Sequence, residues 1–447
     1  MIAQFTKNRL MALMIVLIAL LAVAPLYAQE AEPVTVTDAN GNEVVIEDAS
    51  RIITIGGTVT ETVFALGLQD QIIAIDDSSI YPAAIISELP SVGYLRFLTA
   101  EPILALEPTL IIATQDVGPQ EVVEQLQASG ITFLIVPAVD TPDGAVQIIT
   151  TIAAALSSDE AGAAIVEGLQ ADIATAEALT ATVETTPRVM FIFARGEGVT
   201  GIAGTNTGAD EMIALAGGEN AVTDYEGYEA ISAEAVIAAD PDIIVTTSNS
   251  IESLGGIETF TALPGIAETT AAQNGNILYS MDDLYLLGFG PRTGDAVLDL
   301  TYLLHPELPR PLPVVLRLQG DFPILLQALD IAGQVEFYSG EGPYTLFAPN
   351  GDAFATLPPG LLGGLFSSPI SVQAVIAYHV VEGIYTAEDL TALDGQSLTS
   401  LLGQELSITV AEDGTVLVND VAVVAADLEA SNGIIHVVGG VLLPTRQ

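Results

Sequence analysis

The feature that most constrains the fold is an internal repeat. Residues 99–114 (TAEPILALEPTLIIAT) return as residues 232–247 (SAEAVIAADPDIIVTT), 133 positions later. In each copy a hydroxyl residue precedes a short helical segment, and the first turn holds a glutamate, where the helix dipole favours a negative charge. An acid-proline pair then ends the helix, and a buried strand follows. Two copies predict two similar α/β lobes.

Short strands and helical segments alternate ahead of the first copy. Residues 34–46 alternate around an Asn-Gly pair and predict a β-hairpin. Residues 51–55 predict a buried strand, residues 60–66 a helix and residues 72–75 another strand. This order is typical of a parallel sheet covered by helices, so we expect Rossmann-like lobes.

An alanine-rich and leucine-rich stretch without proline, residues 145–183, separates the two lobes. Apolar residues recur in it at helical spacing, and residues 157–159 (Ser-Ser-Asp) predict a break followed by a new helix cap. We expect a connecting helix over about 159–183, within a two-lobed domain over 29–304. A long helical connector implies small relative motion of the lobes.

The first residues are typical of a secretory signal peptide. Lys7 and Arg9 precede the apolar residues 10–24, and the small residue Ala28 occupies the cleavage position. We expect residues 1–28 to be removed and the protein to be exported, soluble in the periplasm or another extracytoplasmic space. An uncleaved N-terminal anchor is the alternative.

Acidic side chains dominate the chain, which has a formal net charge of −47 and no cysteine. Beyond residue 28 there are 8 basic and 57 acidic side chains, and none of the basic ones is lysine. Such a surface repels nucleic acid and anionic lipid, so neither is expected as a partner. The missing cysteine excludes disulfides, thiolate metal sites and a lipid-modified cysteine.

The sequence pattern changes near the start of the C-terminal third. Residues 305–312 are proline-rich and predict an extended, stiff linker. Beyond it we expect a helix over 325–331, a strand over 344–348, and short strands punctuated by turn residues from 398 onward. Residues 313–447 therefore predict a separate α+β domain.

One short segment combines a phenol with a guanidinium. Tyr94 and Arg96 are two residues apart, which places both on one side of an extended backbone. If that side lines a cleft, the arginine favours the ionised phenol. A phenolate suits ferric iron, and tyrosine is a known axial ligand of haem. The alternative is a wall tyrosine beside a solvent-exposed arginine.

These residues belong to a set of words that resembles a known family. Residues 51–304 resemble the haemin-binding periplasmic component of bacterial haem ABC importers, in which a helix joins two lobes. The Val-Gly-Tyr word with a basic residue two places later is the specific part of the resemblance. The matching words are Gly56-Gly57-Thr58-Val59-Thr60-Glu61, Tyr81-Pro82, Leu89-Pro90-Ser91-Val92-Gly93-Tyr94-Leu95-Arg96, Gly118-Pro119, Ala216-Gly217-Gly218-Glu219-Asn220 and Gly288-Phe289-Gly290-Pro291-Arg292.

The resemblance implies roles for five residues. Tyr94 matches the axial ligand of ferric haem iron, and Arg96 matches the basic residue that supports it. Arg292 lies in the Gly-Pro-Arg word and is expected to bind the phenolate or a propionate; a structural arginine at a turn is the alternative. Glu101 and Glu234, one in each repeat copy, match the glutamates that dock into the permease of the importer. Stabilisation by the helix dipole explains them equally well.

The histidines bear on the choice of ligand. The only three are His305, His379 and His436, all outside the predicted lobes. We therefore expect five-coordinate haem iron or a weak sixth ligand, and no zinc or manganese transport. Cobalamin binders of this class use tryptophan, which this chain lacks. A ferric siderophore or a corrinoid remains the alternative ligand of the same fold.

The tail, from about Leu312 to Pro444, resembles a fasciclin domain, which implies adhesion or contact with another protein. His379 and His436 fall in its words and are expected to be packed structural residues. The matching words are Thr345-Leu346-Phe347-Ala348-Pro349-Asn350 with Phe354, Tyr378-His379-Val380-Val381, Asn432-Gly433-Ile434-Ile435-His436-Val437-Val438 and Val441-Leu442-Leu443-Pro444.

The leading hypothesis is an exported protein that captures ferric haem and delivers it to an ABC importer, with a fasciclin module for contacts. A different hypothesis is an adhesion or scaffold protein in which the fasciclin domain is the working part. No enzyme is expected, because the chain has no cysteine nucleophile, no Gly-x-Ser-x-Gly motif and no histidine beside a serine and an acid in the lobes.

Overall fold

The structure is a computed structural model that describes residues 33–82, 86, 88–196, 198–358, 360–366 and 368–445. The predicted signal peptide, residues 1–28, lies outside the described residues. The chain forms two compact units. The first runs to Ala138 and includes Gln147–Gly162, and the second comprises Val139–Val146 and the chain from Ala163 onward.

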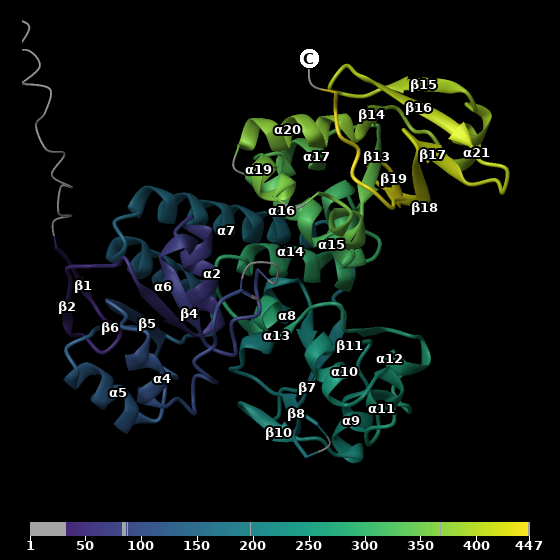
Figure 1. Cartoon of the computed structure of the whole chain (residues 1–447). Helices are drawn as coiled ribbons and strands as arrows, with labels where there is room; N and C mark the ends of the chain where they lie inside the picture. Colours follow the sequence, from purple (N-terminus) through teal and green to yellow (C-terminus); the bar gives the residue numbers. More distant parts are fainter. Residues whose placement is uncertain are drawn as a thin grey trace, which may run out of the picture. The chain divides into compact units, whose positions relative to one another are not determined.

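A parallel sheet of four strands, in the order β4-β3-β5-β6, forms the centre of the first unit. Helices α4 and α5 cover one face of this sheet, and α2 lies on the other (Figure 1). The elements are β1 Val34–Thr37, β2 Glu43–Ile46, β3 Ile52–Ile55, α2 Gly57–Ala65, η1 Gln69–Gln71, β4 Ile72–Ile75, α4 Ala100–Ala105, β5 Leu110–Thr114, α5 Gln120–Ala128 and β6 Thr132–Val136.

The apolar runs of this unit form strands because both faces of the sheet are covered. All four residues of β3 are buried, as expected for a strand in a parallel sheet. The predicted hairpin is confirmed, with Val34 opposite Ile46, and the Ala39 N–H donates to the Ile135 carbonyl of β6 at 2.8 Å.

Two helices follow the first sheet, α6 (Pro142–Ala155) and α7 (Asp159–Thr180). The break between them falls at the predicted position, where Ser157 has a positive φ of 54°. Helix α7 ends three residues before the predicted position.

The sheet of the second lobe has the order β10-β8-β7-β11-β12, and β9 also pairs with β7. Strands β7, β9, β11 and β12 are parallel, whereas β8 and β10 extend the sheet in antiparallel pairs. The elements are β7 Arg188–Ala194, β8 Thr200–Ala203, α8 Gly208–Leu215, β9 Glu219–Asn220, β10 Tyr228–Ala230, α9 Ala233–Ala239, β11 Ile243–Val245, α10 Ser248–Ser253, α11 Ile257–Thr261, α12 Thr270–Gln273, β12 Ile277–Leu278, α13 Asp283–Leu287 and α14 Thr293–Leu304.

The predicted repeat is a repeat of structure. In both copies the acid before the proline takes the left-handed conformation, with φ 48° at Glu107 and 35° at Asp240. An arginine at the start of the neighbouring strand donates to each of these carbonyls: Arg51, directly before β3, from Nε to Glu107 at 3.0 Å, and Arg188, the first residue of β7, from Nη1 to Asp240 at 3.3 Å. The acid therefore closes the helix, and the arginine fixes the start of the strand beside it.

The C-terminal domain contains a mixed sheet of seven strands, in the order β14-β13-β19-β18-β17-β16-β15. Strand β13 separates two cores: Leu346 and Ala348 face one, and Phe347 faces the other. The elements are α15 Leu312–Gln319, α16 Pro323–Ile331, α17 Val335–Ser339, β13 Tyr344–Pro349, α18 Gly351–Ala355, α19 Leu361–Phe366, α20 Pro369–Tyr378, β14 Val380–Glu382, α21 Ala387–Ala392, β15 Gln396–Thr399, β16 Glu405–Val410, β17 Val416–Val418, β18 Val421–Ala430 and β19 Gly433–Val438.

The predicted extended linker, residues 305–312, is instead packed into the fold. His305, Leu308 and Leu312 are buried, and α15 begins at Leu312. The Arg310 carbonyl accepts a hydrogen bond from the Ser431 N–H at 2.7 Å. Prolines dominate the pattern of this segment, but the apolar side chains between them supply the burial.

Among the described residues, no helix combines the length and apolar character needed to cross a bilayer.

Candidate functional site

Tyr94 lies at the carboxyl edge of the first sheet, where ligands bind in open α/β sheets. The chain before it runs beside β4, and the Val92 N–H donates to the Ile75 carbonyl at 2.8 Å. Gly93 then turns with φ 96°, a conformation that glycine adopts without strain, and its carbonyl accepts from the Asp77 N–H at 3.0 Å. These bonds fix the backbone on the N-terminal side of Tyr94.

Gly118 fixes the backbone on the other side. Its N–H donates to the Leu95 carbonyl at 2.9 Å, and its carbonyl accepts from the Leu98 N–H at 3.1 Å. Leu95 and Leu98 are both buried in the core of the first lobe. Tyr94 is therefore held between two anchored segments.

The ring of Tyr94 is half-buried and packs against that core, so it is neither enclosed among aliphatic side chains nor fully in solvent. Its centroid lies 5.9 Å from that of Phe97, whose side chain is 78% exposed. An aromatic ring that exposed, next to the predicted iron ligand, offers an apolar face to a flat ligand.

Arg96 is paired with Asp116, which follows β5, at a distance of 2.6 Å between Nη2 and Oδ2. The hydrogen bond to Asp116 is the main reason that the pKa of Arg96 is raised, and Tyr94 adds a smaller electrostatic effect. The Arg96 guanidinium therefore interacts with the phenol of Tyr94, but its hydrogen bond goes to the carboxylate of Asp116. Both partners are about half exposed, and such ion pairs contribute about 0–1 kcal/mol.

The Gly-Gly-Thr word lies at the same edge and has a structural role. Gly56, with φ 109°, donates its N–H to Asp76 Oδ1 at 2.9 Å. The hydroxyl of Ser79 donates to the same oxygen at 2.9 Å and also bonds Thr60 at 2.6 Å. This buried network fixes the loops after β3 and β4.

Arg292 is the residue directly before α14, in the second unit. Its guanidinium carbon lies 4.7 Å from the centroid of the Tyr285 ring, within the range of a cation-π contact. The buried Tyr285 hydroxyl donates to Asp299 Oδ2 at 2.8 Å. Arg292 is therefore placed by a supported aromatic ring, and its role toward a ligand stays a prediction.

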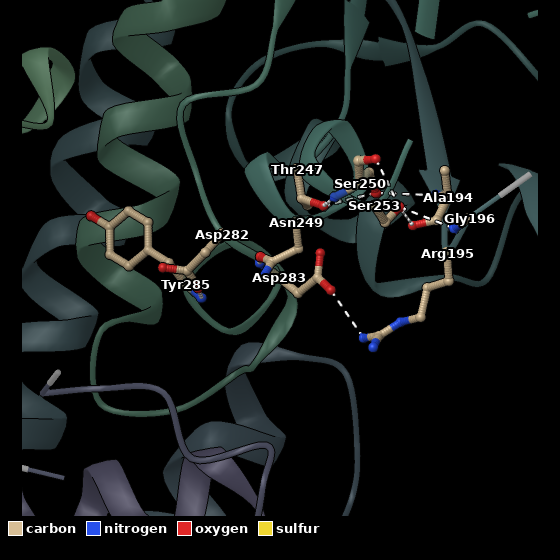
Figure 2. Close-up of polar contacts among 10 residues, drawn as sticks. All are labelled: Ala194, Arg195, Gly196, Thr247, Asn249, Ser250, Ser253, Asp282, Asp283 and Tyr285. Carbon is tan, nitrogen blue, oxygen red and sulfur yellow. Dashed lines mark hydrogen bonds and ion pairs between the residues drawn. The ribbon is translucent and has the colours of Figure 1, made fainter. Parts of the chain in front are cut away.

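Sequence reasoning missed Arg195, which directly follows β7 at the carboxyl edge of the second sheet. Figure 2 shows its guanidinium directed at Asp283, with 3.0 Å between Nη2 and Oδ2. The Asp283 N–H donates to Asn249 Oδ1 at 2.9 Å. Arg195 also lies 5.4 Å from the centroid of Phe193. An arginine directly after a buried strand, in a chain with so few cations, was the signal available.

Two serines of α10 hold the loop that carries Arg195. The Ala194 N–H donates to Ser250 Oγ at 3.0 Å and the Gly196 N–H to Ser253 Oγ at 3.1 Å (Figure 2). Ser250 is oriented in turn by Thr247, whose hydroxyl donates to it at 2.9 Å.

Glu101 and Glu234 are both exposed and lie in the first turns of α4 and α9. Their role in contacting a permease stays a prediction. The helix caps differ between the copies: Ser232 Oγ accepts from the Ala235 N–H at 3.2 Å, whereas Thr99 makes no side-chain cap bond.

The histidines are structural. His305 was predicted to lie outside the lobes. It is instead buried, and its Nε2 is 3.2 Å from the carbonyl of Ala216 in the second lobe. In the C-terminal domain, burial lowers the pKa of His379 to about 4, and the Leu442 N–H donates to its Nε2 at 3.0 Å. His436 Nε2 bonds the Tyr385 carbonyl at 2.7 Å. In the part of the chain that the structure describes, no cluster of three metal-ligating side chains forms.

A separate cavity of about 350 Å³ in the first unit is lined by amides and apolar side chains, and Tyr94 is not among them. Its lining residues are Asn40, Asn42, Gln115, Val117, Gln120, Val123, Gln127 and Ile135.

Two α/β sheets with polar residues at their carboxyl edges, followed by a mixed C-terminal sheet, define a binding protein with an added domain. Residues 52–284 match the periplasmic binding protein family and residues 320–444 the fasciclin domain. The chain belongs to the periplasmic binding protein family, which confirms the predicted class and the predicted fasciclin domain. Its members are binding proteins rather than enzymes.

Solved haem-binding proteins resemble the chain. The periplasmic heme-binding protein RhuT from Roseiflexus sp. RS-1 is 39% identical, with a TM-score of 0.56, over 58% of this chain and 99% of that one. HutB of Vibrio cholerae, also a periplasmic heme-binding protein, is 32% identical, with a TM-score of 0.53, over 58% and 100%. A cobalamin-binding protein of Halobacterium salinarum is 28% identical over 254 residues, which are 55% of this chain and 67% of that protein.

Proposed function

We propose that the protein binds ferric haem through Tyr94 as an axial ligand. The observation that carries the proposal is the half-exposed Tyr94 ring, anchored on both sides at the carboxyl edge of the first sheet, in a fold shared with haem-binding proteins. A fixed backbone favours binding because little conformational freedom is lost when the ligand arrives.

The neighbouring residues supply the remaining chemistry. A phenolate is a hard anionic ligand that suits ferric iron. Arg96, which interacts electrostatically with Tyr94, is proposed to stabilise that anion, and its exposed bond to Asp116 is weak enough to exchange. Phe97 offers the apolar surface that a porphyrin ring requires. Arg292, in the second unit, is proposed to bind a propionate.

We further propose delivery to an ABC importer, with Glu101 and Glu234 as the residues that contact its permease. Both are exposed in the first turns of equivalent helices, one in each copy of the repeat. A substrate-binding protein of this class acts outside the cytoplasm, in agreement with the predicted signal peptide.

Haemin titration of the purified protein tests the central proposal. Tyr94→Phe removes only the phenolic oxygen and should weaken haemin binding by at least about tenfold, which corresponds to about 1.4 kcal/mol. Tyr385→Phe, in the C-terminal domain, serves as the matched control and should bind as the wild type does. Equal affinity of Tyr94→Phe and wild type would exclude Tyr94 as the ligand.

A corrinoid is the second candidate, and one observation favours it. Asp283 Oδ1 is buried and has no hydrogen-bond partner among the described residues. The amide groups of a corrinoid can donate to such an oxygen, and a cobalamin-binding relative exists. Competition between haemin and cobalamin distinguishes the two, since Tyr94→Phe should not change the affinity for a corrinoid.

A further inference from the structure

The strongest polar contact between the C-terminal domain and the second lobe centres on Arg317, in α15. Its Nε donates to Asp299 Oδ1 at 2.7 Å, and its Nη1 lies 3.4 Å from Asp295 Oδ1. The side chain of Arg317 is 13% exposed and that of Asp299 only 3%. Both aspartates belong to α14, so one buried arginine joins the two parts of the second unit.

The contact does not end at Asp299. Its second oxygen, Oδ2, accepts the hydroxyl of Tyr285, which lies in α13, at 2.8 Å. The face of the Tyr285 ring lies 4.7 Å from the guanidinium carbon of Arg292. An unbroken series of contacts therefore runs from Arg317 through Asp299 and Tyr285 to Arg292.

The helix itself aligns these residues. Arg292, which caps α14, and Asp295 and Asp299 within the helix are three and four residues apart, so they lie along one face of the helix. Helix α7 packs closely behind them, because a Cβ at Gly294 would come within 2.7 Å of the Leu169 carbonyl. The start of α14 is thus tightly held on the side facing α7.

We propose that Arg317 is a positioning residue for Arg292, so that α15, which packs into the core of the C-terminal domain, takes part in ligand binding. This inference rests on the proposed haem-binding function. Arg317 keeps Asp299 ionised and oriented, Asp299 holds the Tyr285 hydroxyl, and the fixed ring holds the Arg292 guanidinium. A partner that shifts α15 would thereby change the affinity for haem.

The physical reason is that a buried ion pair is sensitive to the loss of one partner. Without Arg317, Asp299 and Asp295 would remain as uncompensated charges beside one another, and Asp299 would have to reorient or take up a proton. Either response alters the acceptor that the Tyr285 hydroxyl uses. In an exposed ion pair, such as Arg96 with Asp116, the loss of one partner has a much smaller effect.

The test is a set of full-length variants titrated with haemin. Arg317→Met should bind haemin about fivefold or more weakly than the wild type, the lower range of measured coupling between sites. Arg292→Met should also bind more weakly, and the double variant should be no weaker than Arg292→Met alone. Independent, additive effects, or unchanged affinity in Arg317→Met, would overturn the proposal.

Arg310→Met is the matched control. Arg310 lies seven residues before Arg317 and donates from Nη2 to the Tyr302 carbonyl of α14 at 2.7 Å, but it makes no hydrogen bond to Asp299. Its loss removes an arginine contact with α14 that goes to a backbone carbonyl and lies outside the series, so haemin affinity should stay at the wild-type value. If Arg310→Met lost as much haemin affinity as Arg317→Met, any weakening of the contact with α14 would be enough. That result would contradict a specific route through Asp299 and Tyr285.

Tyr285→Phe keeps the proposal testable if Arg317→Met does not fold. It removes the bond to Asp299 while leaving the ring under Arg292 and the ion pair of Arg317 intact. We expect haemin affinity to fall, again without a further loss in combination with Arg292→Met. Unchanged affinity in a folded Tyr285→Phe would exclude the route through the hydroxyl.

Hydrogen exchange separates this inference from the proposed function. In the absence of haem, Arg317→Met should exchange the amides of α13 (Asp283–Leu287) faster, and Arg310→Met should not. If wild-type protein fails to bind haemin through Tyr94, the function is wrong, yet this exchange result still decides whether the series of contacts couples the domains. Unchanged exchange in α13 would refute the coupling itself.

Discussion

At the scale of single residues, the candidate site depends on how firmly one side chain is presented. Tyr94 follows a glycine whose conformation suits few other residues, and hydrogen bonds fix the segments before and after it. Its neighbour Phe97 is exposed to solvent, and the Phe97 ring lies beside the Tyr94 ring. Rigid presentation of an exposed aromatic pair is what a site for a flat ligand needs.

Arg96 offers a prediction that separates stability from binding. Because its bond to Asp116 is exposed, Arg96→Met should lower the free energy of unfolding by no more than about 1 kcal/mol. Haemin affinity should fall more clearly, because the phenolate loses the positive charge of Arg96, which interacts with Tyr94. Urea unfolding and haemin titration of the same preparation check both. A variant that loses stability but keeps its affinity would contradict the assigned role.

Gly56 offers a prediction about the scaffold behind the site. A Cβ there would lie 2.9 Å from Thr114 Cγ2, and φ is 109°. Gly56→Ala should therefore destabilise the protein by about 1–3 kcal/mol. Gly67 has φ 76° but open space around it, so Gly67→Ala should cost less. Urea unfolding midpoints compare the two, and equal losses would show that the contact with Thr114 has no cost.

At the scale of elements, the sequence predicted most of the buried strands of the lobes and the helix ends of the repeat. The strands β3, β4, β5 and β11 were predictable because buried parallel strands are short apolar runs between turn residues. The acid-proline pairs marked helix ends through their local conformation. Contacts between distant residues were not predictable, since no local pattern encodes the pairing of Arg317 with Asp299 or of Arg195 with Asp283.

The linker shows the same limit. Its prolines predicted an extended spacer, whereas its leucines are buried and Arg310 pairs with Ser431, 121 residues later in the chain. Tyr94, Arg96 and Arg292 were identified from the sequence only through a resemblance to a family. Their surroundings, including Asp116 and Tyr285, became visible only with the structure.

The two helix caps of the repeat allow a matched comparison. Ser232 accepts a hydrogen bond from the Ala235 N–H, and Thr99 makes no such bond. Ser232→Ala should lower the free energy of unfolding by about 1 kcal/mol, a typical value for a lost N-cap. Thr99→Ala should cost clearly less. Chemical unfolding of the two variants tests this, and equal costs would contradict the difference between the copies.

At the scale of the whole molecule, acidic groups gather around Arg317, the largely buried arginine that joins α15 to α14. The titratable side chains facing it are Asp172, Tyr285, Asp295, Asp299, Tyr302 and Asp330. Burial raises the pKa of Asp299 to about 6, against the opposing effect of Arg317. Burial, with repulsion from Asp295, raises the pKa of Asp172 to about 6. Asp330 is exposed to water, which screens its charge, so Asp172 and Asp299 dominate the pH dependence.

This arrangement predicts how stability depends on pH. The folded-state pKa values of Asp172 and Asp299 lie above the unfolded value of about 3.9, so the folded protein binds more protons between about pH 4 and 7. The free energy of unfolding should therefore decrease as the pH rises through about 6. Asp172→Asn should stabilise the protein by about 1 kcal/mol at pH 8 and by much less at pH 5. Urea unfolding at both pH values measures this, and a pH-independent difference would contradict it.

The most direct test of the account is the resonance Raman spectrum of the protein loaded with haemin. If Tyr94 ligates the iron, wild-type protein shows iron-tyrosinate vibrational bands, and Tyr94→Phe lacks them while keeping its fold. If the bands are absent from the wild type, or persist in Tyr94→Phe, then Tyr94 does not hold the iron and the proposed function is wrong.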